Sequence, residues 1–403
     1  STPKKEGFND RLLTETIDSI ANDAIQKKAT PGCVVAILKN EKLIFEKGYG
    51  YQNYDSMVPV TTNTIYDLAS VTKIAATTLA VMKLWEGKKI DLKKKISEYL
   101  PWLKNSNKEK LTLENLLMHQ AGLVPFIPFY KSAMDENGHP KSEIFSNKEN
   151  DEYKIPVADT LFMQSQWLDT MDNQIKTSTV NSNELKYVYS DNDFILLGNV
   201  VSAVSGMPLN EYVKKEFYDS LGMTSTCFKP FEHFSIAEIA PTEEEKQFRQ
   251  QLIHGYVHDP GAAMMGNVAG HAGLFSNVYD LGILFQMLLN GGTFNGKRYL
   301  EKETIDWFTS YQTPVSRRGL GFDKPEKNNK ELNAAHAYPS VSASPLTFGH
   351  TGFTGTCVWA DPKYNLVYIF LSNRVCPTSD NNKLVKMNVR SNIQEAIYKA
   401  IKK

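Results

Sequence analysis

The stretch YDLASVTKIAAT (Tyr66–Thr77) places a serine and a lysine three residues apart in a segment that is otherwise built mostly of apolar and small residues. If this segment is helical, residues three apart share one face, so the Ser70 hydroxyl and the Lys73 amine are neighbours in the first turn. The spacing by itself is weak evidence, because Ser1 and Lys4 repeat it in a polar amino-terminal tail. The rest of the chain therefore decides whether this pair forms a site.

The bulk composition describes an ordinary globular protein. The 403 residues are 41% hydrophobic and 22% charged, which suffices for a large core in one elaborate domain or two lobes. The 45 basic and 45 acidic side chains cancel, so the net charge does not favour nucleic acid or an anionic membrane as a partner. No segment approaches the roughly 18 consecutive apolar residues of a membrane-spanning helix.

The cysteines and the amino terminus do not settle the compartment. Cys33, Cys227, Cys357 and Cys376 lack Cys-x-x-Cys spacing, so we interpret them as buried thiols. A bridge between Cys357 and Cys376 is the one pairing left open. The chain begins at Ser1 without methionine or a visible signal peptide, which fits a processed chain whose export signal has been removed.

The predicted elements follow the order strands, helices, strands. Periodicity and turn residues predict a helix capped by Asn9 or Asp10 and ended at 30–32, a hairpin of strands 33–39 and 42–52, helices within 70–87, 112–123, 190–206 and 277–292, two strands around Asp361-Pro362-Lys363, and a closing helix over 383–403. A chain that starts a sheet, leaves it to build a helical lobe and then returns forms a cleft between lobes, where ligands commonly bind.

We therefore predict an α/β (α+β) fold in a single domain, residues 1–403, with an antiparallel sheet flanked by helices and an all-helical lobe. Residues 1–66 and 291–403 form the sheet-containing lobe, and residues 67–290 form the mainly helical one. The segment 125–185 is polar with weak periodicity, so we expect a loop-rich insertion beside the cleft.

Three short segments are candidates to meet in this cleft. They are the Ser70–Lys73 turn, YVYSDND with Tyr189 and Asp191, and GHTGFTGT with His350 at the start of a strand. Ser-x-x-Lys, Ser-Asp-Asn and Lys-Thr-Gly in this order are the signature of class A β-lactamases and penicillin-binding proteins. The order is kept here, and the third motif is altered.

Longer strings extend the likeness over most of the chain: GKKIDLKKKISEYLPWL, LTLENLLMHQAGL, YSDNDFILLGNVVSAVSGMPLNEYV, LGMTST, GHAGLFSNVYDLGILFQMLLNGG and FGHTGFTGTCVWADPKYNLVYIFLSNR. On these residues the sequence resembles serine β-lactamase-like hydrolases, the family of class C β-lactamases, bacterial esterases and low-molecular-weight penicillin-binding proteins. The resemblance implies a β-lactamase/transpeptidase-like fold, a periplasmic or cell-envelope location, and neither a metal nor an organic cofactor. HDPGAAMMGNVAGHAGLF and GHTGFTGT are also similar to serine hydrolase modules that some Bacteroidetes carry behind a family-3 glycoside hydrolase domain, so such a domain is possible upstream in the full-length protein.

The chemistry explains why a lysine accompanies the serine. A serine hydroxyl attacks a carbonyl only when a nearby base takes its proton, and Lys73 is within reach. A lysine is protonated at neutral pH unless burial or a neighbouring cation lowers its pKa. The apolar neighbours Ala69, Ile74 and Ala75 favour such a lowering.

The second motif offers a different base. The resemblance to class C relatives, which use a Tyr-x-Asn motif, assigns proton transfer to Tyr189 and puts Asp191 at the asparagine position, facing substrate. An acid there can hold Lys73 protonated and leave Tyr189 to accept the serine proton. Ser190-Asp191-Asn192 also reads as the class A Ser-Asp-Asn, so this second alignment stays open.

The third motif supplies the remaining parts. An acyl intermediate needs two donors aimed at its oxyanion, and the resemblance implies the backbone N–H groups of Ser70 and Phe353. Gly352 allows close approach to the strand edge, and Thr351 with His350 lines the substrate site. Relatives carry lysine where His350 stands, and a histidine is mostly neutral at pH 7, so efficient penicillin hydrolysis is not expected. His-Thr-Gly is similar to D-aminopeptidase-like and esterase-like relatives.

The other histidines carry weaker signals. His271, in GHAGL, is expected to border the cleft and contact substrate or support the structure. His119 is expected to satisfy backbone groups at a helix end. His254 and His258 have a spacing that can bind zinc, and with Asp259 they form an alternative metal site, although nearby glycine and proline argue against the helix it needs.

These observations predict a serine hydrolase that cleaves an ester or amide through a Ser70 acyl-enzyme. By resemblance, the favoured substrates are D-amino acid or cell-wall-derived peptides, with short esters close behind. The alternatives are a true β-lactamase, a non-catalytic sensor that binds penicillin or wall peptides, and a zinc hydrolase.

Overall fold

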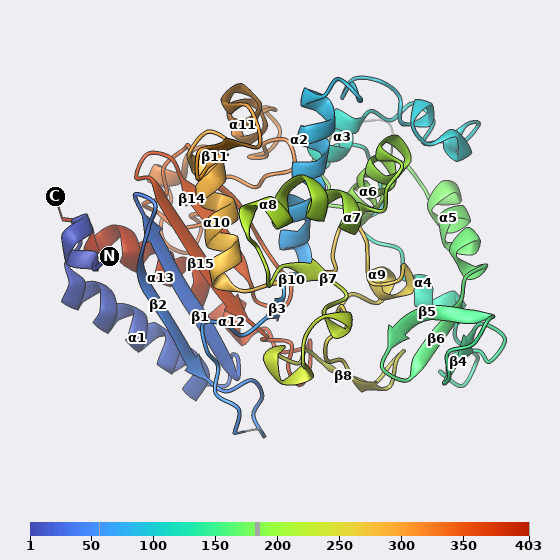
Figure 1. The fold of residues 1–403 in the computed structure, drawn as a ribbon, viewed down its shortest axis with the longest axis horizontal. Coiled ribbons are helices and arrows are strands. Elements are labelled where there is room, and N and C mark those ends of the chain that lie inside the picture. The colour runs from blue at the N-terminus through green and yellow to red at the C-terminus, as the bar shows by residue number, and fades with distance from the viewer. Residues whose placement is uncertain (56, 182–185, 403) are drawn as a thin grey trace.

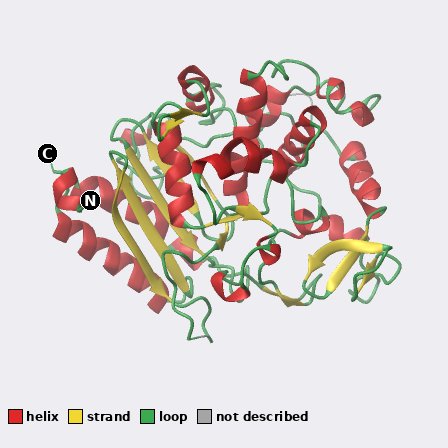
Figure 2. Ribbon diagram, viewed as in Figure 1, coloured by secondary structure: helices red, strands yellow, loops and turns green. Residues whose placement is uncertain are grey.

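A five-stranded antiparallel sheet forms one half of the molecule (Figures 1 and 2). The computed structural model describes residues 1–55, 57–181 and 186–402. The sheet order is β13 (Phe348–Thr351), β14 (Cys357–Asp361), β15 (Leu366–Ser372), β1 (Gly32–Lys39) and β2 (Lys42–Gly50). The predicted return of the chain to its first sheet is confirmed, because β15 pairs with β1 along the whole length of β1, from Cys33 opposite Ser372 to Lys39 opposite Leu366.

Helices cover both faces of this sheet, and β1 shows why. Alternate residues of a strand point to opposite faces. Val34, Ala36 and Leu38 join the large core that the helical half shares, whereas Val35 and Ile37 pack in a second core. The second core lies under α1 (Asp10–Gln26) and α13 (Val389–Ala400), and α10 (Val278–Leu289) covers the opposite face (Figure 1).

The predicted hairpin and first helix are confirmed in detail. The Asn9 side chain accepts a hydrogen bond from the Leu12 N–H at 3.2 Å and so caps α1. Asn40 and Glu41 both have positive φ, 51° and 65°, which is the backbone of a tight two-residue hairpin turn between β1 and β2. The helix ends at Gln26, earlier than the predicted stop at residues 30–32.

The other half is mainly helical, as predicted. Its helices and those that follow are α2 (Thr78–Glu86), α3 (Leu113–Leu117), α4 (Phe129–Ser132), α5 (Trp167–Thr177), α6 (Asp191–Ser205), α7 (Leu209–Val213), α8 (Asp219–Leu221), α9 (Pro260–Met264), α11 (Lys302–Thr309) and α12 (Lys383–Lys386). The closing helix is interrupted, because Asn388 adopts φ 53° between α12 and α13.

Short strands that the periodicity did not reveal complete the fold. β3 (Tyr66–Asp67), β10 (Leu274–Ser276) and β7 (Cys227–Phe228) form one small sheet, β4 (Phe145–Ser146), β6 (Leu161–Gln164) and β5 (Tyr153–Ala158) form another, and β8 (Glu244–Glu245) with β9 (Gln251–Leu252) and β11 (Thr293–Phe294) with β12 (Lys297–Arg298) form two ribbons. The segment 125–185 therefore holds a sheet and α5, more regular structure than a loop-rich insertion; its residues 182–185 lie outside the described part.

The structure also bears on the cysteines and on the expected lack of a membrane-spanning helix. All four cysteines are free thiols, so the bridge left open between Cys357 and Cys376 does not form. Among the described residues, none of the helices combines the length and apolar character needed to cross a bilayer.

Gly270 packs directly against the backbone of α6. A Cβ on Gly270 would sit 1.9 Å from the Phe194 carbonyl oxygen, a backbone atom that cannot move aside. We expect Gly270→Ala to lower the free energy of unfolding by about 3 kcal/mol, the upper part of the range for overpacked sites, and to lower the melting temperature measured by differential scanning calorimetry. Gly87→Ala is the matched control, because its nearest atom, the Lys83 carbonyl oxygen, would be 3.4 Å away. Equal melting temperatures for the two variants would contradict this prediction.

Candidate active site

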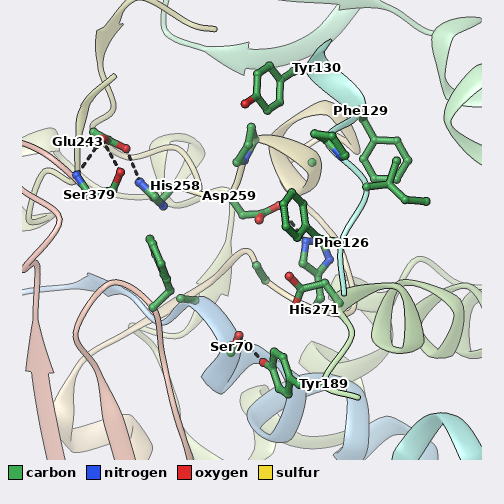
Figure 3. A pocket seen from close by; sticks show the side chains of 18 of the residues that line it. Ser70, Phe126, Phe129, Tyr130, Tyr189, Glu243, His258, Asp259, His271 and Ser379 are labelled. Carbon is green, nitrogen blue, oxygen red and sulfur yellow. Dashed lines mark hydrogen bonds and ion pairs between the residues drawn. The ribbon is translucent and has the colours of Figure 1, made fainter. Parts of the chain in front are cut away.

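Ser70 lies at the centre of a compact hydrogen-bonded group. The Lys73 ammonium donates to Ser70 Oγ at 2.9 Å. The Tyr189 hydroxyl donates to the same oxygen at 2.8 Å, the contact drawn between these two residues in Figure 3. The three side chains come from two elements, the helical segment after β3 and the residue before the cap of α6. One serine oxygen therefore has two possible proton partners.

The backbone before Ser70 turns sharply. Ala69 has φ 46°, a left-handed conformation that costs a residue with a Cβ about 1 kcal/mol. The Asp67 carboxylate accepts the Ala69 N–H at 2.8 Å and holds this turn. A 3₁₀ turn over Ala69–Val71 and a π-helical turn over Lys73–Thr77 then lead into α2. The sequence predicts a continuous helix here, whereas the structure has two irregular turns before α2. Irregular turns of this kind cluster at functional sites.

Lys73 is fully buried and carries an ion pair. Its Nζ lies 2.7 Å from Asp191 Oδ1 and donates to the His271 carbonyl oxygen at 3.2 Å. Burial lowers the pKa of Lys73, but the Asp191 carboxylate and Tyr189 outweigh this effect, and the net pKa is above its usual value. The expectation that apolar neighbours lower this pKa is therefore wrong. The lysine rests as an ammonium, which leaves Tyr189 as the acceptor.

The competing Ser-Asp-Asn alignment does not fit the geometry. Ser190 Oγ donates to the Val124 carbonyl oxygen at 2.5 Å and caps α6, and the Asn192 amide donates to the same carbonyl at 2.9 Å. Both side chains are thus engaged away from Ser70, whereas Tyr189 contacts it.

His119 packs against the Tyr189 ring. Its ring lies 4.5 Å from the Tyr189 ring, and its Nδ1 accepts the Ser190 N–H at 3.2 Å, a backbone group at a helix end as expected. Asp193 Oδ2 lies 2.7 Å from the same nitrogen. Burial raises the pKa of Asp193 and lowers that of His119, with Arg318 adding to the latter. Burial therefore disfavours a charge on either member of this pair.

The third motif differs from the expectation in one respect: His350 and Thr351 lie at the end of β13, not at the start of a strand. His350 Nδ1 donates to the Thr351 carbonyl oxygen at 2.7 Å, so its Nε2 accepts from Arg318 at 3.2 Å. Burial and then Arg318 lower the pKa of His350 to about 3. The imidazole is therefore neutral, and the positive charge beside this strand belongs to Arg318.

Arg318 is buried and paired with Asp323, so it is not available to bind a ligand. Its side chain is 1% exposed and lies 3.4 Å from Asp323. Arg317 binds the same carboxylate at 2.8 Å, and the arginines hold the pKa of Asp323 below its usual value despite its burial. A substrate carboxylate would have to displace one of these pairings.

The turn after β13 is pinned against the segment before Ser70. Thr354 and Thr356 donate their hydroxyls to the carbonyl oxygens of Asp67 and Leu68, at 2.7 and 3.0 Å. A Cβ on Gly352 would meet Leu68 O at 2.4 Å, so packing inside the protein, more than substrate approach, requires this glycine. Phe353 and Ser70, the predicted oxyanion donors, follow these pinned segments.

A cavity of about 930 Å³ lies over this group. The predicted site residues that line it are Ser70, Tyr189, Asp191, His271, His350, Thr351 and Phe353. Lys73 lies beneath its floor. In the view of Figure 3, Ser70 and Tyr189 occupy one end and Phe129 and Tyr130 the other, with Asp259 and His271 between them.

The alternative zinc site is wrong. His254 Nε2 contacts the Ile239 carbonyl oxygen at 2.6 Å, and His258 Nε2 lies 2.7 Å from Glu243. Across the described ranges, the His, Cys, Asp and Glu side chains close enough to share an ion are instead Asp191, Asp259 and His271.

Sequence reasoning missed two structural groups at the cavity. Glu243 accepts hydrogen bonds from the backbone and side chain of Ser379, at 2.8 and 2.7 Å, and so ties the loop after Cys376 to His258. Arg318 reaches His350 from 32 positions away. No local motif marks either contact, although the adjacent arginines before a glycine-rich turn were a visible signal.

Comparisons with known proteins agree with this geometry. The model of the family described as β-lactamase matches residues 17–386. The chain belongs to the β-lactamase family. It is 32% identical over 399 residues to a protein of Salmonella enteritidis PT4 (strain P125109) named "Putative D-alanyl-D-alanine carboxypeptidase", a match that covers 93% of this chain and 85% of the relative.

Solved structures of this β-lactamase family show the same fold. EstCE1, described as a hydrolase with promiscuous acyltransferase activity, superposes with a TM-score of 0.68 at 18% identity and covers 96% of this chain and 99% of its own. The D-amino acid amidase of Ochrobactrum anthropi SV3 gives 0.65 at 16% identity, with 96% and 99% covered. The β-lactamase/transpeptidase-like fold predicted from the sequence is confirmed.

Proposed function

We propose that this β-lactamase-family serine hydrolase cleaves esters or amides through an acyl-enzyme on Ser70. The observation that carries the proposal is the convergence of two donors, Lys73 and Tyr189, on Ser70 Oγ at the floor of a cavity. A pure sensor needs neither partner on this oxygen, so the geometry favours an enzyme.

In the first half-reaction, the Tyr189 hydroxyl oxygen accepts the Ser70 proton while Oγ forms a bond to the substrate carbonyl carbon, and the hydroxyl's own proton moves toward the leaving group. The Lys73 ammonium stabilises the developing charge on Oγ, and the Ser70 and Phe353 N–H groups stabilise the oxyanion. The bond to the leaving group then breaks, and the proton that moved toward it passes to the departing nitrogen or oxygen. In the second half-reaction water attacks the acyl carbon, Tyr189 takes the proton of that water, and the proton returns to Ser70 Oγ.

The proposed substrates are D-amino acid or cell-wall-derived peptides and amides, with short esters second. The relatives' names support this choice: one is a D-alanyl-D-alanine carboxypeptidase by name, and a similar fold serves a D-amino acid amidase. A neutral His350 argues against efficient penicillin hydrolysis, because it offers no fixed charge to the carboxylate of a β-lactam. Such substrates imply a location in the cell envelope.

Intact mass spectrometry with a fluorophosphonate and, separately, with benzylpenicillin tests this proposal. We expect one fluorophosphonate adduct, located by peptide mapping on the peptide that contains Ser70, and at most a minor penicillin adduct. A fluorophosphonate adduct on another residue, or none on the folded protein, would refute the Ser70 acyl-enzyme. A single stable penicillin adduct at Ser70 would instead favour the penicillin-binding alternative.

A further inference from the structure

Two carboxylates face one another in the cavity beside Ser70. Asp191 begins α6 and Asp259 caps α9, and their ligand atoms lie within 4.8 Å of each other and of His271. Both side chains are partly exposed, 27% and 34%, and both line the cavity. We propose that this pair binds the free α-ammonium group of an aminoacyl substrate, so that the enzyme prefers esters and amides of unblocked amino acids. The inference rests on the proposed Ser70 chemistry.

Each carboxylate keeps an oxygen for a ligand. Asp191 Oδ1 is taken by Lys73, and Asp259 Oδ1 accepts the Ala262 N–H at 2.7 Å and lies 2.8 Å from His271 Nε2. Within the described part of the chain, no hydrogen bond or ion pair involves the Oδ2 atom of either residue. Carboxylate oxygens of the two residues lie within 4.8 Å of each other, a separation that one –NH₃⁺ group at about 2.8 Å from each oxygen can bridge.

His271 supplies an independent sign of an unfilled polar site. It is 3% exposed, and its Nδ1 is buried without a hydrogen-bond partner among the described residues. Buried polar atoms are rarely left unpaired, and those that are need an explanation such as a ligand. The Asp259 carboxylate can only accept a hydrogen bond, so His271 Nε2 carries a proton on the side that faces it. A metal ion fits less well than an ammonium, because the nitrogen that faces Asp259 carries a proton and has no lone pair to give.

The position fits an amine next to the scissile carbonyl. In an amino acid the nitrogen lies about 2.5 Å from the carbonyl carbon, and a reacting carbonyl carbon lies about 3 Å from the nucleophile. The α-nitrogen is then within about 5.5 Å of Ser70 Oγ. Asp191 Oδ1 is linked to this oxygen through Lys73 by contacts of 2.7 and 2.9 Å, so the Asp191 carboxylate is close enough to accept a hydrogen bond from an ammonium held at that distance from Ser70.

The chemistry of Asp191 points the same way. In class C relatives an asparagine at this position can donate to a substrate carbonyl, whereas a carboxylate only accepts hydrogen bonds. Asp191 therefore suits a substrate N–H donor and disfavours the carbonyl of an N-acyl group. Arg318 is buried and paired with Asp323, and His350 is neutral, so neither side chain provides a free positive charge to bind a substrate carboxylate.

A matched substrate pair tests the inference: D-alanine methyl ester and N-acetyl-D-alanine methyl ester, followed by pH-stat titration at pH 7. A charge-assisted hydrogen bond contributes about 1.5–3 kcal/mol, so we expect kcat/KM for the free amine to exceed that for the blocked ester by about 10–100-fold. Asp259→Asn keeps the side-chain oxygen that caps α9 but removes the charge. This variant should reduce the ratio of the two kcat/KM values by about 10-fold, mainly through KM for the free amine.

Asp151→Asn is the matched control, because Asp151 is a fully exposed aspartate outside the cavity lining and should leave the ratio unchanged. Equal or faster hydrolysis of the acetylated ester, or a ratio insensitive to Asp259→Asn, would overturn the inference while leaving the Ser70 chemistry intact. Loss of activity with EDTA that zinc restores would overturn it in favour of a metal. Failure of both esters together with an unlabelled Ser70 would overturn the proposed function and this inference with it.

Discussion

Replacing Ser70 with alanine is expected to remove the fluorophosphonate adduct and to lower kcat/KM by about 10⁴–10⁶-fold, the range seen when a serine nucleophile is deleted. The reason is structural: Lys73 and Tyr189 both direct their polar atoms to Ser70 Oγ, and among the described residues no other hydroxyl receives this pair. Without that oxygen no acyl-enzyme can form. Intact mass spectrometry and steady-state kinetics on the best ester substrate measure the two effects.

The change should not disturb the fold, because it deletes one oxygen and leaves the backbone turn at Ala69 held by Asp67. A melting temperature close to that of the parent protein would exclude unfolding as the cause. Ser165→Ala, an exposed serine outside the cavity, is the matched control and should retain full labelling and activity. Retention of the adduct in Ser70→Ala would show that another residue is the nucleophile.

The fold was predictable where sequence patterns are local. Two strand-like segments around the polar Asn40-Glu41 turn predicted the hairpin of β1 and β2, and the structure contains it, with a register shift between Ile37 and Leu38. The short strands β3 and β10 were not predicted, since only pairing with distant segments makes them strands. β5 was not predicted either, because Pro156 and weak periodicity argue against a strand and the strand forms only by pairing with β6.

The site was predictable to the extent that each residue belongs to a motif. Ser70, Lys73 and Tyr189 carry recognisable neighbours, and they meet in the structure. The sequence left two directions open for the pKa of Lys73, a lowering by apolar neighbours and protonation held by Asp191, and only the 2.7 Å contact decides that the second prevails. The pairing of Asp259 with Asp191 depends in the same way on two helix starts that meet only in three dimensions.

Lys73→Met is expected to lower kcat/KM by about 10²–10⁴-fold, the usual contribution of a group that assists proton transfer. Methionine fills the same buried, unbranched space, but it removes the ammonium that donates to Ser70 Oγ and balances Asp191. Because Asp191 is partly exposed, water can solvate its carboxylate, so the fold should survive the change. Kinetics on the same ester, together with a thermal melt, provide the measurement.

The variant also separates the two roles a lysine can have. If Lys73 acted as a neutral base, wild-type kcat/KM would rise as pH increases through a lowered pKa; because its pKa is raised, the ammonium persists and Lys73 should add no such rise between pH 5 and 9. Lys83→Met, in the following helix α2 with its Nζ on the Tyr299 carbonyl oxygen, controls for loss of a hydrogen-bonded, partly buried amine and should keep nearly full activity. A Lys73→Met enzyme as active as this control would mean that Tyr189 alone activates Ser70, and that the ion pair with Asp191 serves the fold instead of the reaction.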